Sequence, residues 1–91
     1  MTTLERAIDV YGVDMQLTVA IEEFSELTKE LCKSKRGADN RKAIIEEMAD
    51  CYIMLKQLEI IYDIDPRDIA MIMKNKIHRL ECRLEERSKN G

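Results

Sequence analysis

The chain has 91 residues, of which 45% are hydrophobic, 36% are charged and 4% are aromatic, with a net charge of −3. This length predicts one domain, and the mixed, slightly acidic charge argues against a nucleic-acid-binding protein, whose domain is usually basic. No apolar run approaches the roughly 20 residues that span a bilayer, and the first ten residues lack a signal-peptide core. We therefore expect a cytoplasmic protein without membrane contact, with three reduced cysteines.

The N-terminal segment 1–12 is predicted to form a short helix. Thr2 and Glu5 have the spacing of a capping box, and Gly12 is the expected stop signal. The segment is short enough to be an arm or lid instead of a full member of a bundle. With only three glycines and one proline in the chain, long helices are favoured over strands for the remainder.

Three longer helices are expected after the first. Asp14 is the expected cap of the second helix, and Asp39 or Asn40 caps the third after a polar loop. Asp65 precedes the single proline, which suits the first position of a fourth helix. The expected ranges are 14–33, 41–62 and 66–88. Helices joined by such short links predict an all-α four-helix bundle.

The third helix is apolar nearly all round, which predicts that it is covered on most sides. Its main apolar stripe is expected to comprise Ile44, Ile45, Met48, Tyr52, Leu55 and Tyr62. The stripe of the second helix is expected to comprise Leu17, Ala20, Ile21, Phe24, Leu27 and Leu31. Four helices of one short chain do not easily cover the third one. We therefore expect a homodimer in which two such helices meet at a shared centre.

One acidic pattern occurs twice, as EEFSE in the second helix and EEMAD in the third. Glu23 and Glu26 are three residues apart, as are Glu47 and Asp50, so each pair lies on one helix face with Cβ atoms roughly 5–6 Å apart. If the two helices form an antiparallel hairpin, the four carboxylates converge. Their repulsion raises pKa values unless a divalent cation neutralises it. Ligation by oxygen alone suits Mg²⁺ or Mn²⁺ rather than Zn²⁺.

The acidic pattern has two other interpretations, a di-iron site and ordinary solvated helix surface. A di-iron bundle requires a Glu-x-x-His motif, but Asn75 stands three residues before the single histidine, His78. A lone Glu-x-x-Glu motif is usually solvated helix surface. Two such motifs on consecutive helices, each beside an apolar stripe, are less easily explained by chance.

The fourth helix carries a basic face, formed by Lys76, Arg79, Arg83 and Arg87. We expect Arg83 and Arg87 to be solvated or salt-bridged, whereas Lys76 and Arg79 lie nearer the middle of the helix. Metal ions beside cationic side chains suit a polyphosphate substrate. The isolated glycines form no phosphate-binding loop, and no Ser/His or Cys/His pairing has a spacing that indicates a covalent intermediate.

Three segments, E23-F-S-E26, E47-M-A-D50 with the following CYIML, and K76-I-H-R79, together resemble the MazG-like all-α nucleoside triphosphate pyrophosphohydrolase superfamily over about residues 17–80. The resemblance implies one MazG-like helical domain over residues 1–91, assembled as a homodimer or a dimer of dimers. It also implies Mg²⁺-dependent hydrolysis of a ribo- or deoxyribonucleoside triphosphate between the α and β phosphates, which yields the monophosphate and pyrophosphate.

The resemblance also implies roles for individual residues. The implied catalytic metal ligands are Glu23, Glu26, Glu47 and Asp50. Lys76 and Arg79 are implied to contact phosphates, and Asn75 corresponds to an Asn that some members use. The sequence leaves open whether Lys74 or Lys76 makes the phosphate contact, and whether Glu26 or Glu23 activates water. A base pocket is expected to use Tyr11, Met15 and Val19 of one chain, together with Met54 of the partner subunit. The alternative is that these residues simply fill the core.

Two alternatives remain at this point. The first is a non-catalytic helical dimerisation or interaction module, and the second is an enzyme of the same scaffold with another substrate. That second group includes dUTP or dCTP pyrophosphatases and phosphoribosyl-ATP pyrophosphohydrolases. The sequence does not distinguish dimer from tetramer or identify the preferred nucleotide.

Overall fold

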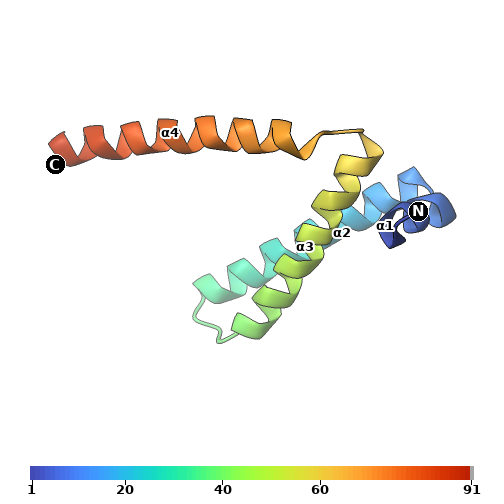
Figure 1. Ribbon diagram of the computed structural model, residues 1–91. Coiled ribbons are helices and arrows are strands. Elements are labelled where there is room, and N and C mark those ends of the chain that lie inside the picture. The colour runs from blue at the N-terminus through green and yellow to red at the C-terminus, as the bar shows by residue number, and fades with distance from the viewer. Residues whose placement is uncertain (91) are drawn as a thin grey trace.

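Residues 1–90 form four α-helices joined by short connections (Figure 1). The computed structural model describes the backbone of residues 1–90 and the side chains of residues 1–89. The helices are α1 (Thr3–Tyr11), α2 (Val13–Lys35), α3 (Arg41–Ile61) and α4 (Pro66–Asn90). No strand occurs within residues 1–90, so the predicted all-α class with four helices is confirmed.

The helix starts follow the local sequence in two of the cases that were predicted. Thr2 Oγ1 accepts a hydrogen bond from the Glu5 amide at 3.2 Å, and Glu5 Oε1 accepts one from the Thr2 amide at 3.1 Å, which completes the capping box. Asp65 Oδ1 accepts from the Arg67 amide at 2.9 Å, directly before the first residue of α4. In both cases a side-chain oxygen satisfies an amide that has no partner within the helix.

One predicted cap is wrong, and another occupies the expected position without a side-chain capping bond. Gly12, with φ of 89°, both ends α1 and precedes α2, so Asp14 lies inside the first turn of α2 instead of capping it. Asn40 precedes α3 but makes no capping hydrogen bond. Its Nδ2 donates to Glu30 O at 2.9 Å and to Glu30 Oε1 at 3.1 Å, so it joins the start of α3 to α2.

Helices α2 and α3 form an antiparallel hairpin, and α1 packs against one end of it (Figure 1). The hairpin interior contains few apolar side chains. The buried residues are Gln16, Ala20, Glu30, Cys51, Met54 and Gln57. Small residues such as Ala20 and Cys51 allow the two helices to approach closely, so the contact surface between them is narrow.

The predicted apolar stripe of α3 lies mainly on the outside of this hairpin, whereas the predicted stripe of α2 runs from buried Ala20 to exposed positions. Ile21 and Leu31 of α2 are 66% and 49% exposed, and Tyr52 and Leu55 of α3 are 62% and 47% exposed. The face of α3 that meets α2 is instead the one carrying Cys51, Met54 and Gln57, which lie outside the predicted main stripe. The prediction failed because a helix with two apolar faces does not itself specify which face its neighbour covers.

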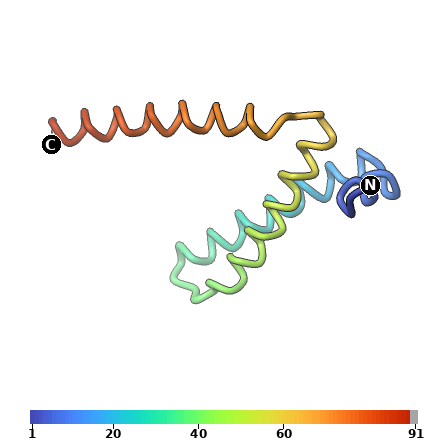
Figure 2. Tube along the Cα trace, viewed as in Figure 1, coloured from blue at the N-terminus to red at the C-terminus, as the bar shows by residue number. Residues whose placement is uncertain are grey.

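Helix α4 extends away from the hairpin, as the traces in Figure 1 and Figure 2 show. Every described side chain from residue 66 to residue 89 is exposed. Within one chain α4 therefore does not complete the expected four-helix bundle. Helix α4 is also not a membrane span, because no helix in the described part of the chain combines the length and apolarity needed to cross a bilayer.

The extended shape leaves an unusually large surface in contact with solvent. The accessible area is 7712 Å², whereas a compact chain of 10.6 kDa exposes about 5,500 Å². The radius of gyration is 17.3 Å, compared with about 12 Å for a compact domain of this length. Much of the excess is apolar, since large hydrophobic residues of α3 and α4 are among the exposed ones.

Candidate metal centre

Three carboxylates converge between α2 and α3, near the middle of both helices. Glu23 comes from α2, and Glu47 and Asp50 come from α3. One oxygen of each lies within 4.8 Å of the others. The Cys51 thiol donates to the Glu23 carbonyl oxygen at 3.5 Å, and this contact between the two helices holds Glu23 opposite the acidic pair. We call Glu23, Glu47 and Asp50 the acidic centre.

The negative charges of the acidic centre oppose one another. Partial burial raises the pKa of Glu23, and a hydrogen bond shared with Asp50 and the charges of Asp50, Glu47 and Glu26 raise it further. Burial also raises the pKa of Glu47, followed by the charges of Asp50 and Glu26. The pKa of the Cys51 thiol is raised for the same reasons, burial first. The predicted repulsion between the acids of the two motifs is therefore present.

The Glu47 carboxylate has an unmet requirement. Its Oε2 atom is buried and has no hydrogen-bond partner among the described residues. A buried carboxylate oxygen without a donor is costly, because it has lost its water and gained nothing in return. A cation bound among the three carboxylates would satisfy this oxygen and remove the repulsion. The donors are all carboxylate oxygens, which fits Mg²⁺ or Mn²⁺.

Glu26 does not join the other three carboxylates. It lies one helical turn after Glu23 and is exposed, and it acts on the acidic centre through its charge. The structure thus groups three of the four predicted metal ligands. Glu26 is left with free oxygens beside them.

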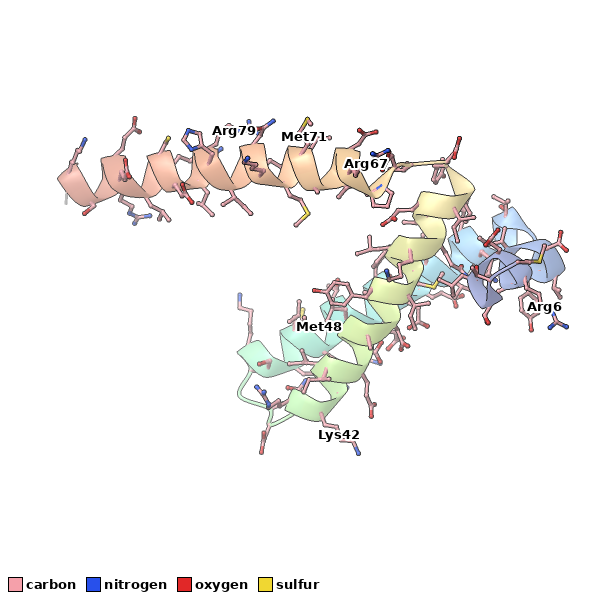
Figure 3. All side chains as sticks on the ribbon, viewed as in Figure 1. Arg6, Lys42, Met48, Arg67, Met71 and Arg79 are labelled. Atoms are coloured by element: carbon pink, nitrogen blue, oxygen red, sulfur yellow. The ribbon has the colours of Figure 1, made fainter. Side chains whose placement is uncertain are left out.

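The predicted phosphate-binding residues lie elsewhere in the chain. Asn75, Lys76 and Arg79 are all exposed on α4. Figure 3 shows Arg79 on the extended part of α4, well separated from Met48 on the hairpin. One chain therefore does not bring these residues to the acidic centre. Lys74 is equally exposed, and the structure favours neither lysine.

No protein-family model, curated protein or solved structure matches the chain. The observations support an all-α four-helix protein with an acidic centre. Membership of the MazG-like superfamily stays a prediction carried by the sequence motifs.

Two features of the structure were missed from the sequence. Glu30 of α2 is buried and has a structural role. Hydrogen bonds from Asn40 and then Lys33 lower the pKa of Glu30, and its Oε2 lies 3.1 Å from Lys33 Nζ. His78 and Cys82 form a contact on α4, although no Cys/His pairing was recognised. Their spacing of four residues was the available signal.

The residues expected around a nucleotide base have different environments. Tyr11 and Met15 are 66% and 53% exposed near the junction of α1 and α2, whereas Met54 is 5% exposed. In this chain Met54 fills the hairpin core, which was the alternative interpretation for these residues. The exposed pair remains available for contact with a ligand or a second chain.

The acidic centre makes stability depend on pH in a direction that can be tested. The pKa of Glu23 in the folded state is raised above the ordinary value of 4.5. Between 4.5 and the raised value, the folded state holds more protons than the unfolded state, so the free energy of unfolding falls as pH rises. We expect Glu23→Gln to become progressively more stable relative to the wild type as pH rises above 4.5 in EDTA.

Urea denaturation at a series of pH values measures this difference. Glu22→Gln is the matched control, because Glu22 is adjacent, exposed and carries the same charge. Below pH 4.5 Glu5 and Glu30 act in the opposite direction, since their pKa values are lowered, but they do so equally in all three proteins. Parallel pH curves for the wild type and Glu23→Gln would contradict the assignment of repulsion to the acidic centre.

Proposed function

We propose that the protein is a Mg²⁺-dependent nucleoside triphosphate pyrophosphohydrolase, which converts a ribo- or deoxyribonucleoside triphosphate to the monophosphate and pyrophosphate. The observation that carries the proposal is the acidic centre, in which two helices bring three carboxylates together and leave the buried Glu47 Oε2 without a partner. The repeated acidic motif and its resemblance to MazG-like enzymes supply the choice of reaction.

Glu23, Glu47 and Asp50 would hold the metal. When bound, Mg²⁺ or Mn²⁺ supplies Lewis acidity and neutralises charge on the triphosphate. Glu26 has free oxygens beside the centre and is our candidate to accept the proton of the attacking water, with Glu23 as the alternative. The water oxygen bonds to the α phosphorus, the bond to the α–β bridging oxygen breaks, and pyrophosphate leaves.

We propose that a second chain supplies the cationic side of this site. Helix α4 has no cover in its own chain, and it presents Lys76 and Arg79 beside an apolar stripe that includes Ile77 and Leu80. If the stripe packs against the hairpin of a partner, the basic residues at its edge approach an acidic surface. The proposed assembly is a homodimer or a homotetramer. Asn75 would join the phosphate contacts in this arrangement.

The proposal is tested with a panel of canonical and modified nucleoside triphosphates, assayed with Mg²⁺ and with Mn²⁺. We expect pyrophosphate and the nucleoside monophosphate as first products, with no turnover in EDTA. The panel includes dUTP, dCTP and phosphoribosyl-ATP, which separate the related substrate classes. Orthophosphate as the first product would contradict the proposed site of cleavage.

A non-catalytic dimerisation or interaction module is the second candidate, and the uncovered apolar surface of α3 and α4 favours it. Such a module would associate with a second chain yet release no pyrophosphate from any member of the panel. Its stability would also be insensitive to Mg²⁺ and Mn²⁺, so a metal-dependent change in melting temperature separates the two functions.

A further inference from the structure

His78 and Cys82 form a candidate pair of metal ligands on α4, apart from the acidic centre, and Glu81 lies beside them. Cys82 Sγ lies 3.7 Å from His78 Nε2. The other ring nitrogen, His78 Nδ1, lies 4.0 Å from Glu81 Oε2. The three residues are three and four positions apart, so their side chains lie over the same stretch of helix surface.

The distance between the sulfur and the nitrogen is suited to a shared metal ion. In tetrahedral zinc sites the Zn–S and Zn–N bonds place a cysteine sulfur and a histidine nitrogen about 3.6 Å apart. The observed 3.7 Å matches this separation without movement of either side chain. On the far side of the imidazole, Glu81 Oε2 lies 4.0 Å from His78 Nδ1, beyond hydrogen-bond distance. A rotamer change of the exposed Glu81 side chain would let it accept the other ring N–H, as carboxylates do beside metal-binding histidines.

We propose that His78 and Cys82 bind a divalent transition metal ion that prefers nitrogen and sulfur ligands, Zn²⁺ in the first instance, and that Glu81 orients the imidazole. Binding releases the thiol proton to solvent, because the thiolate is the ligand. Two protein ligands leave the remaining coordination positions to water. The acidic centre offers oxygen ligands only, so the two sites select different metals.

The site remains accessible when other surfaces of α4 are covered. At 100° per residue, His78 and Cys82 lie on the side of the helix away from the stripe that includes Ile77 and Leu84. The His78 and Glu81 side chains are 75% and 66% exposed. Packing of the stripe against a second chain would therefore leave the metal ligands in solvent.

Alkylation of cysteines with and without Zn²⁺ tests the proposal, with excess Mg²⁺ present to occupy the acidic centre. We expect Zn²⁺ to slow alkylation of Cys82, measured by mass spectrometry of peptides, while Cys32 keeps its rate. Cys32 is the matched internal control because it is also exposed and free. The residues one turn away from it are Thr28, Lys29, Lys35 and Arg36, none of which is a metal ligand of this type.

Two variants make the test specific. His78→Gln should abolish the protection of Cys82, and Glu81→Gln should weaken the apparent zinc affinity by about 10-fold. Unchanged Cys82 reactivity in the wild type, equal slowing of Cys32 and Cys82, or full protection in His78→Gln would each overturn the proposal. None of these results bears on pyrophosphate release, so a failure here is distinguishable from a failure of the proposed function.

Discussion

Asp50→Asn and Glu47→Gln are expected to abolish stabilisation of the protein by Mg²⁺ or Mn²⁺ while increasing its stability in EDTA. Each substitution removes one negative charge from a centre in which three carboxylates lie together. Without metal this relieves repulsion, and with metal it removes a ligand. The opposite signs of the two effects distinguish a metal centre from an ordinary structural cluster.

The expected size of the effect follows from linkage. A metal ion present at 100 times its dissociation constant stabilises the folded wild type by about 2.7 kcal/mol, and this gain should disappear in both variants. If the protein has the proposed activity, pyrophosphate release should fall by roughly 100-fold or more, as it does when one electrostatic contact to a transition state is removed. Thermal denaturation and the pyrophosphate assay measure the two effects.

Glu46→Gln is the matched control for Glu47→Gln. Glu46 is adjacent and exposed, and it is not one of the three grouped carboxylates. We expect it to retain both metal-dependent stabilisation and activity. Equal behaviour of Glu46→Gln and Glu47→Gln, or a wild type whose melting temperature ignores metal, would contradict the metal centre.

The wild-type protein is expected to sediment as a dimer or larger assembly at micromolar concentration. The chain exposes about 2,200 Å² more than a compact chain of its mass, which is the scale of an obligate homodimer interface. Beside the exposed apolar face of α3, where it borders α2, lies a hollow of 220 Å³ lined by Leu27, Met48, Cys51, Tyr52 and Leu55. We expect both the uncovered α4 stripe and this hollow to pack against a second copy of the chain.

Leu55→Glu should dissociate the assembly, because it places an unpaired carboxylate in the proposed interface. An uncompensated buried charge costs at least about 3 kcal/mol, which corresponds to a loss of affinity of roughly 100-fold or more. Analytical ultracentrifugation over a range of protein concentrations measures this change. Lys56→Glu, at an adjacent exposed position, changes the net charge more than Leu55→Glu does, yet it should leave the assembly intact. A wild type that sediments as a stable monomer would refute this account of the exposed surface.

Local signals in the sequence were sufficient for the helices and for part of the site. The capping box at Thr2, the stop at Gly12 and the start at Asp65 depend on interactions within one turn, and all three occur in the structure. The spacing of Glu47 and Asp50 likewise placed both acids on one side of α3. The sequence by itself therefore determined where the helices lie and which acids share a helix face, because these properties depend on neighbours three or four residues away.

Only the tertiary structure decided how the helices are rotated against one another. Cys51 contacts the Glu23 carbonyl across 28 positions of sequence, and this rotation brings Glu23 into the acidic centre while leaving Glu26 exposed. It also turns the larger apolar face of α3 outward and leaves α4 uncovered within its own chain. Helical periodicity identifies each apolar face of a helix equally well. Close packing of small residues such as Ala20 decides which of these faces is buried against the neighbouring helix.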